Sequence, residues 1–174
     1  GNENAPLYYA GPNQINAQVP FGSVPGDHLP IVVNSNGRLS APQTYLITAV
    51  QPSLFQNDGA AAALDGRSRF ITPQNPARIG DTLQLFATGL GLTDPAVATG
   101  AAAPASTTVF VDVSVRIGGV EVPVVYQGLA PGYVGLYQVN VVLTPNLTPG
   151  DDVAVVIRQN GIPSNSVSIP LRNP

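Results

Sequence analysis

Apolar and polar residues alternate along several short stretches of this chain. In the clearest stretch, Val109 to Ile117, every second residue is Val or Ile. Alternation with a period of two is typical of a strand that buries one face. Similar patterns over 81–88 and 136–143 predict two more strands, and Gly118 with Gly119 predicts a turn into a strand over 120–126.

The last part of the chain has the pattern of a hairpin. An apolar stretch over 153–157 predicts a buried strand, and Asn160-Gly161 supplies residues suited to the positive φ of a tight turn. Val167, Ile169 and Leu171 then alternate along a final strand. Because Pro170 has no backbone N–H, we expect that strand to lie at an edge or to end there. Residues 96–107 are mostly small and predict a flexible loop.

The strongest signal is an internal repeat. Several segments recur 124 positions later, as in 138 − 14 = 124. The matching pairs are Gln14-Ile15-Asn16 with Gln138-Val139-Asn140, Pro25-Gly26-Asp27 with Pro149-Gly150-Asp151, Asn36-Gly37 with Asn160-Gly161, and Ser40 with Ser164. Upstream, Pro6 and Tyr9 match Pro123 and Tyr126 at an offset of 117, as in 123 − 6 = 117, which indicates an insertion in the second copy within 127–137. A constant offset indicates one shared supersecondary unit.

Only the second copy is preceded by strand patterns that could complete it. About seven short strands over ~100 residues are typical of an immunoglobulin-like sandwich. We therefore predict an all-β immunoglobulin-like β-sandwich with a complete module over 66–174, a linker over 57–65, and an incomplete (half) module over 1–56. Two or three strands alone are marginally stable in water, so something else is expected to cover the half-module.

Composition removes several classes of function. Charged residues form 10% of the chain, there is no Lys, and the seven Arg are scattered, so no basic patch for nucleic acid is expected. Without Cys the chain has no thiolate nucleophile and no zinc-thiolate site. No apolar run reaches the ~20 residues of a membrane helix, so we expect no membrane insertion. The chain opens without Met, from which we expect a processed product or a piece of a larger protein.

Two segments resemble a known family. The run Gly80–Gly91 looks like the opening of an immunoglobulin-like domain of the plexin and transcription-factor type. The run Tyr9–Pro20, together with Leu136–Asn140, is similar to a repeat found at the C-terminal end of large secreted acidobacterial proteins of unknown function. The resemblance covers most of the chain. It implies a sandwich fold and an extracellular or cell-surface location in a bacterium, and it brings no catalytic residues with it.

Candidate chemistry is sparse. His28 is the single histidine and lies beside Asp27 in an expected turn, so no catalytic residue is assigned and we expect no enzyme and no cofactor. Calcium is the one metal worth considering, with Asp58, Asp65, Asp151 and Asp152 as weak candidates in loops. Gly89-Leu90-Gly91 follows a strand without the rest of a dinucleotide-binding pattern. Tyr133, in the inserted loop, is a candidate for stacking on a carbohydrate.

Three classes of function follow from these patterns. The first is a structural or adhesive protein of a surface assembly or filament, joined by strand or sheet complementation and self-associating through the incomplete module. Its interface candidates are Ile31, Val32, Val33, Tyr45 and Ile47. The second is a carbohydrate- or protein-binding accessory module of a larger secreted protein. The third and weakest is an enzyme with an unrecognised pair of carboxylates.

Overall fold

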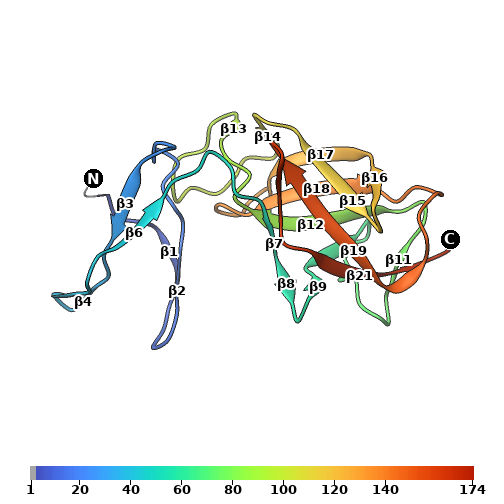
Figure 1. Ribbon diagram of the computed structural model, residues 1–174, viewed down its shortest axis with the longest axis horizontal. Coiled ribbons are helices and arrows are strands. Elements are labelled where there is room, and N and C mark those ends of the chain that lie inside the picture. The colour runs from blue at the N-terminus through green and yellow to red at the C-terminus, as the bar shows by residue number, and fades with distance from the viewer. Residues whose placement is uncertain (1–2) are drawn as a thin grey trace. The chain divides into compact units, whose positions relative to one another are not determined.

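The computed structural model describes residues 3–174 and contains strands but no helix within that range (Figure 1). The prediction of an all-β protein is confirmed. The chain divides into two compact units, unit 1 up to Ala49 and unit 2 from Val50 to Pro174, and each is described by itself.

Unit 2 is built on two sheets. The first has the order β10-β12-β18-β17, with β7 also beside β12, and the second has the order β16-β15-β19-β21-β9-β8, with β11 beside β21 and β20 beside β19. A separate pair joins β13 to β14. The strands of the first sheet are β7 (Ser53–Leu54), β10 (Ala63–Asp65), β12 (Thr82–Thr88), β17 (Val124–Leu129) and β18 (Tyr137–Val142). Those of the second sheet are β8 (Gln56–Asn57), β9 (Ala60–Ala61), β11 (Ala77–Arg78), β15 (Val113–Ile117), β16 (Val120–Val122), β19 (Gly150–Gln159), β20 (Ile162–Pro163) and β21 (Val167–Arg172). The pair is β13 (Thr93–Asp94) with β14 (Thr108–Val109).

The core of unit 2 comes from alternate residues of both sheets. Leu83 and Leu85 of β12 are buried, as are Val139 and Val141 of β18, while the residues between them are partly exposed. In the second sheet, alternate residues of β15, β19 and β21 are buried in the same way. Rows of this kind on two sheets form the core of a β-sandwich, and the strand order is compatible with an immunoglobulin-like one.

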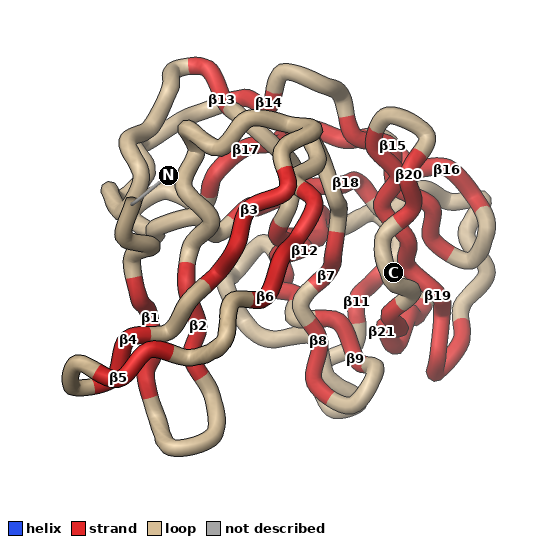
Figure 2. The backbone as a smooth tube through the Cα atoms, turned by 60° about the vertical axis from the view of Figure 1, so that its left-hand side comes forward, coloured by secondary structure: helices blue, strands red, loops and turns tan. Residues whose placement is uncertain are grey.

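Over residues 3–49, unit 1 forms three antiparallel strand pairs. They are β1 (Leu7–Ala10) with β2 (Ile15–Ala17), β3 (His28–Ile31) with β6 (Gln43–Leu46), and β4 (Asn34–Ser35) with β5 (Arg38–Leu39). Figure 2 shows β3 and β6 running side by side as a two-stranded ribbon.

The internal repeat is confirmed strand by strand. Shifted by 124 positions, β2 falls on β18, β3 on β19, β5 on β20 and β6 on β21, and β1 falls on β17 when shifted by 117. Both hairpin turns place Asn and Gly at positive φ, 51° and 81° at Asn36 and Gly37 and 49° and 79° at Asn160 and Gly161. Unit 1 therefore reproduces the second half of unit 2 and has no counterpart of β10, β12, β15 or β16 within the described residues.

The expected boundaries differ from those in the structure. Residues 57–65 are not a linker but carry the end of β8 and all of β9 and β10 within unit 2, and the division falls between Ala49 and Val50. The Ala-rich composition suggested a linker, but Ala61 and Ala63 are buried because small side chains fit beside β12 and β21. The second compact unit therefore starts at residue 50 rather than at residue 66.

Two expected strands are each divided. The alternating stretch 109–117 supplies β14 and β15, with Phe110 and Val111 exposed between them. The expected strand over 120–126 is split at Pro123, so that β16 pairs with β15 while β17 crosses to β18 in the other sheet. A proline cannot donate to a ladder, which explains the break.

The last strand continues through Pro170 and has partners on both sides. Ser168 pairs with Ala60 of β9, and Leu171 pairs with Ala77 of β11, so Pro170 falls between these two short partners. On its other side it faces the irregular register between Gly150 and Val153 of β19. The missing N–H therefore lies where no regular ladder needs it.

These boundaries lead to a first prediction about autonomous folding. A protein of Val50–Pro174 should unfold in one sharp transition, whereas Gly66–Pro174 lacks β7 to β10 and the buried residues Leu54 and Ala63. The shorter protein should be less stable by about 2 to 5 kcal/mol, the usual cost of losing a large core side chain. Denaturant titration followed by fluorescence measures this difference, and equal midpoints would show that the expected linker adds nothing to the module.

Candidate functional site

The two copies of the repeat share hydrogen bonds as well as strands. Val33 N–H donates to Ser40 Oγ at 3.0 Å, and its counterpart Ile157 N–H donates to Ser164 Oγ at 3.0 Å. In the strand before, Gln14 Nε2 donates to Asn16 Oδ1 at 2.6 Å and Gln138 Nε2 to Asn140 Oδ1 at 2.9 Å. Residues at equivalent positions can therefore be compared one to one.

The comparison shows that unit 1 exposes the row that forms the core of unit 2. The exposed fractions are 44% at Ile15, 51% at Ile31, 41% at Val33 and 56% at Tyr45, whereas their counterparts Val139, Val155, Ile157 and Ile169 are each 0% exposed. Val19 is 56% exposed and its counterpart Leu143 only 1%. These side chains, with half-buried Ile47, define what we call the open face of unit 1.

The interface candidates from the sequence fall into two rows. Ile31, Val33, Tyr45 and Ile47 correspond to core positions of β19 and β21 and lie on the open face. Val32 corresponds to half-exposed Val156 and lies on the opposite row. Sequence reasoning missed Ile15 and Val19 as members of the open face, although the offset of 124 already equated them with Val139 and Leu143.

Unit 1 also has two strand edges without partners among residues 3–174. In unit 2, β18 pairs with β12 on the edge away from β17, and β19 pairs with β15 on the edge away from β21. The equivalent strands β2 and β3 pair only with β1 and β6 respectively. Unpaired edges beside an exposed apolar row are features of a surface that accepts another strand.

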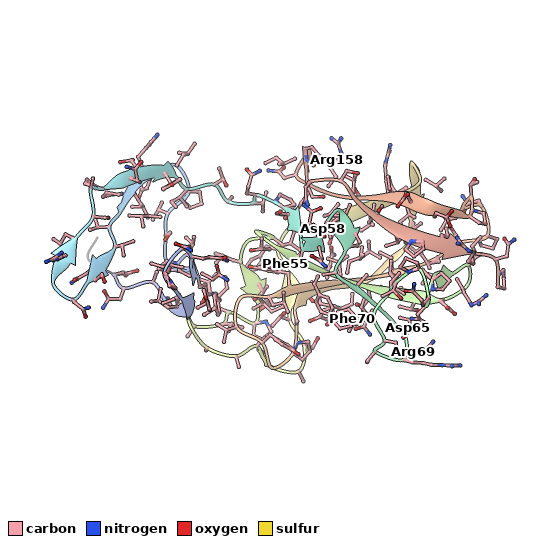
Figure 3. The ribbon with its side chains drawn as sticks, turned by 90° about the horizontal axis from the view of Figure 1, so that it is seen from below. Phe55, Asp58, Asp65, Arg69, Phe70 and Arg158 are labelled. Carbon is pink, nitrogen blue, oxygen red and sulfur yellow. The ribbon has the colours of Figure 1, made fainter. Side chains whose placement is uncertain are left out.

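The calcium candidate Asp65 serves the fold. Its Oδ1 accepts the backbone N–H groups of Arg67 at 2.9 Å and Arg69 at 3.0 Å, and its Oδ2 accepts Arg69 Nε at 2.9 Å and forms an ion pair with the same guanidinium (Figure 3). The backbone hydrogen bond from Arg69 is the main reason why the pKa of Asp65 lies well below its usual value. This carboxylate closes the turn after β10.

The other calcium candidates lie elsewhere. Asp58 occupies the turn between β8 and β9 at a φ of 49°, Asp151 forms an ion pair with Arg172, and Asp152 accepts a long hydrogen bond from Ser168 Oγ at 3.4 Å. Over residues 3–174, no three His, Cys, Asp or Glu side chains come together as metal ligands.

The other residues singled out from the sequence are Tyr133, His28 and Gly89. Tyr133 is 59% exposed in the loop between β17 and β18, so its ring is available for contact. His28 is exposed at the start of β3. Gly89 has a φ of 76°, and a Cβ built on it would overlap the Gln51 carbonyl oxygen, so this glycine permits two backbone segments to approach.

Comparisons with known proteins add no family: the chain matches no protein-family model and none of the curated proteins. Among the residues that the structure describes, no helix is long and apolar enough to cross a membrane.

The role of Asp65 gives a prediction about pH. A carboxyl whose pKa is lowered in the folded state stabilises the fold at pH values above its ordinary pKa of 3.8, and that stabilisation is lost as the pH falls below this value. Asp65→Asn should lower the thermal midpoint at pH 7 and reduce its further fall between about pH 5 and pH 2, the range in which carboxyls protonate.

The control is Asp58→Asn, because Asp58 is exposed and Asn also tolerates positive φ. Thermal unfolding of the three proteins across the pH range provides the measurement. Equal midpoints for Asp65→Asn and the unchanged chain at pH 7 would show that this carboxylate does not hold the turn.

Proposed function

We propose that this chain is a non-catalytic structural or adhesive protein of the bacterial surface, in which a partner polypeptide completes unit 1. The family resemblance supports the surface location, and the low content of charged residues fits a protein that is mainly packed β-structure. The observation that carries the proposal is the open face, since residues equivalent to the core of unit 2 lie exposed beside two unpaired strand edges.

Physical chemistry favours covering this face. Each large apolar side chain that becomes buried contributes about 1.5 to 3 kcal/mol, so Ile31, Val33 and Tyr45 together offer a substantial gain. The unpaired backbone of β2 and β3 adds hydrogen bonds in a fixed register, which gives specificity. A contact made through unit 1 of one chain to a different surface of the next is heterologous and forms rings or filaments.

The alternative is an accessory module that binds carbohydrate. It has one specific observation in its favour, the exposure of Tyr133 in the loop that only the second copy contains. A single tyrosine provides only a small stacking surface. The open face is larger, and it offers both exposed apolar side chains and unpaired backbone groups.

The main prediction compares two neighbouring residues of unit 1. Val33→Asp places a charge on the open face, and Val32→Asp places the same charge on the opposite row of the same segment. Both side chains are similarly exposed, 41% and 44%, so neither change should lower the stability of the free chain. Sedimentation velocity from micromolar to millimolar concentration should show association of the unchanged chain and of Val32→Asp, and loss of that association in Val33→Asp.

Two results would contradict the proposal. One is that all three proteins stay monomeric at every concentration and unit 1 binds no added covering strand either. The other is a loss of thermal stability confined to Val33→Asp in the monomer, because the open face would then be covered within a single molecule.

A separate prediction concerns catalysis. His28 is exposed and is the chain's single histidine, so a nucleophile activated by an imidazole is not expected. Panels of esterase, glycosidase and peptidase substrates should show no turnover above buffer. Turnover that disappears when one aspartate is changed to asparagine would overturn the non-enzymatic assignment.

A further inference from the structure

We infer that the partner of unit 1 is a half-module with the strand pattern of β10, β12, β15 and β16, carried by a polypeptide sequence other than residues 1–174. This inference rests on the proposed function and names the partner. Unit 2 provides the template, because it shows the same two hairpins with their covering strands in place.

The template fixes the register on the first edge. In unit 2, Leu85 of β12 lies opposite Val139, and Leu83 lies opposite Val141. The counterparts in unit 1 are Ile15 and Ala17. The partner strand on this edge should therefore run antiparallel to β2 and place apolar side chains opposite both residues.

The second edge follows in the same way. Val115 of β15 lies opposite Ile157 and Ile117 lies opposite Val155, whose counterparts are Val33 and Ile31. Gly118 N–H donates to the Ala154 carbonyl at 2.8 Å, and hydrogen-bonded pairs alternate along an antiparallel ladder. Val156 is thus the next residue whose backbone forms hydrogen bonds with β15. Its counterpart Val32 therefore directs its backbone N–H and carbonyl groups to the unpaired edge of β3.

A count of strands decides against a second copy as the donor. Each copy of residues 1–174 has two sets of hairpins that need covering, β1–β2 with β3–β6 and β17–β18 with β19–β21. The described residues hold one covering set, β10, β12, β15 and β16, and unit 2 already uses it. Strand exchange among copies preserves this ratio, so one set of hairpins per copy stays uncovered in any ring or filament made by exchange.

Copies could still pack open face against open face. Such packing would bury apolar side chains, but it would leave the edges of β2 and β3 without ladder partners. A donor half-module satisfies both the side chains and the backbone, and for this reason the geometry points to the donor.

The first test adds a peptide to the full chain. The probe is Asp112–Pro123, which carries the β15–β16 hairpin, and the matched controls are the same peptide with Val115→Asp or with Ser114→Asp. Val115 is buried in unit 2 and Ser114 is partly exposed, so only the first change should abolish binding. Amide exchange followed by NMR should show the Val32 amide slowed by about tenfold or more, as expected for an amide that enters a ladder.

A second test uses a graft, in case a short peptide binds too weakly. A copy of residues 50–122 is joined directly ahead of Pro6, the counterpart of Pro123, in an otherwise unchanged chain. Unit 1 should then protect the Val32 amide as unit 2 protects that of Val156, and Val115→Asp within the grafted copy should remove this protection. The inference is overturned if the Val32 amide gains no protection in the peptide experiment and none in the graft experiment.

The outcomes separate this inference from the proposed function. If copies associate through Val33 and neither the peptide nor the graft protects the Val32 amide, the proposed function stands and the donor inference fails. If the chain neither associates nor takes up peptide or graft, both fail. Protection of Val32 with dissolution of the self-associated form supports both.

Discussion

The covering of two β-hairpins by two further strands is the constraint on which the structure of unit 2 depends. β18 and β19 each supply a buried row, and β12 and β15 pair with their free edges and add buried residues of their own to the core. Side-chain burial and backbone pairing are satisfied by the same strands. A hairpin pair that lacks those strands loses both contributions together, and this is the condition of unit 1.

The repeat makes unit 1 informative because the same local sequence signals give the same local structure. Asn-Gly turns, the serine that bonds across each hairpin and the Gln–Asn pair on the preceding strand recur with matching geometry. These features depend on neighbours in sequence and form without the missing strands. The apolar residues depend on distant partners, and their exposure in unit 1 therefore reports which partners are absent from the described residues.

Much of this could be predicted from the sequence, in particular the all-β class, the repeat and the hairpin at Asn160-Gly161, because period-two patterns and turn residues are local. The absence of a linker over 57–65 could not be predicted, because short strands of small residues such as Ala60–Ala61 show no alternation of large apolar residues. The change of sheet at Pro123 is likewise a tertiary feature. At the site, the apolar segments of unit 1 were identified, but the distinction between Val32 and Val33 required the burial of their counterparts in unit 2.

If unit 1 is an acceptor that lacks its covering strands, it should open locally much more often than unit 2. Native-state hydrogen exchange on the free, dilute full chain measures this by comparing counterparts within one molecule. The amides of Ile31, Val33 and Tyr45 should exchange through local opening, far faster than those of Val155, Ile157 and Ile169, which should exchange near the global limit. Equal protection of the two sets in the monomer would contradict the acceptor role of unit 1.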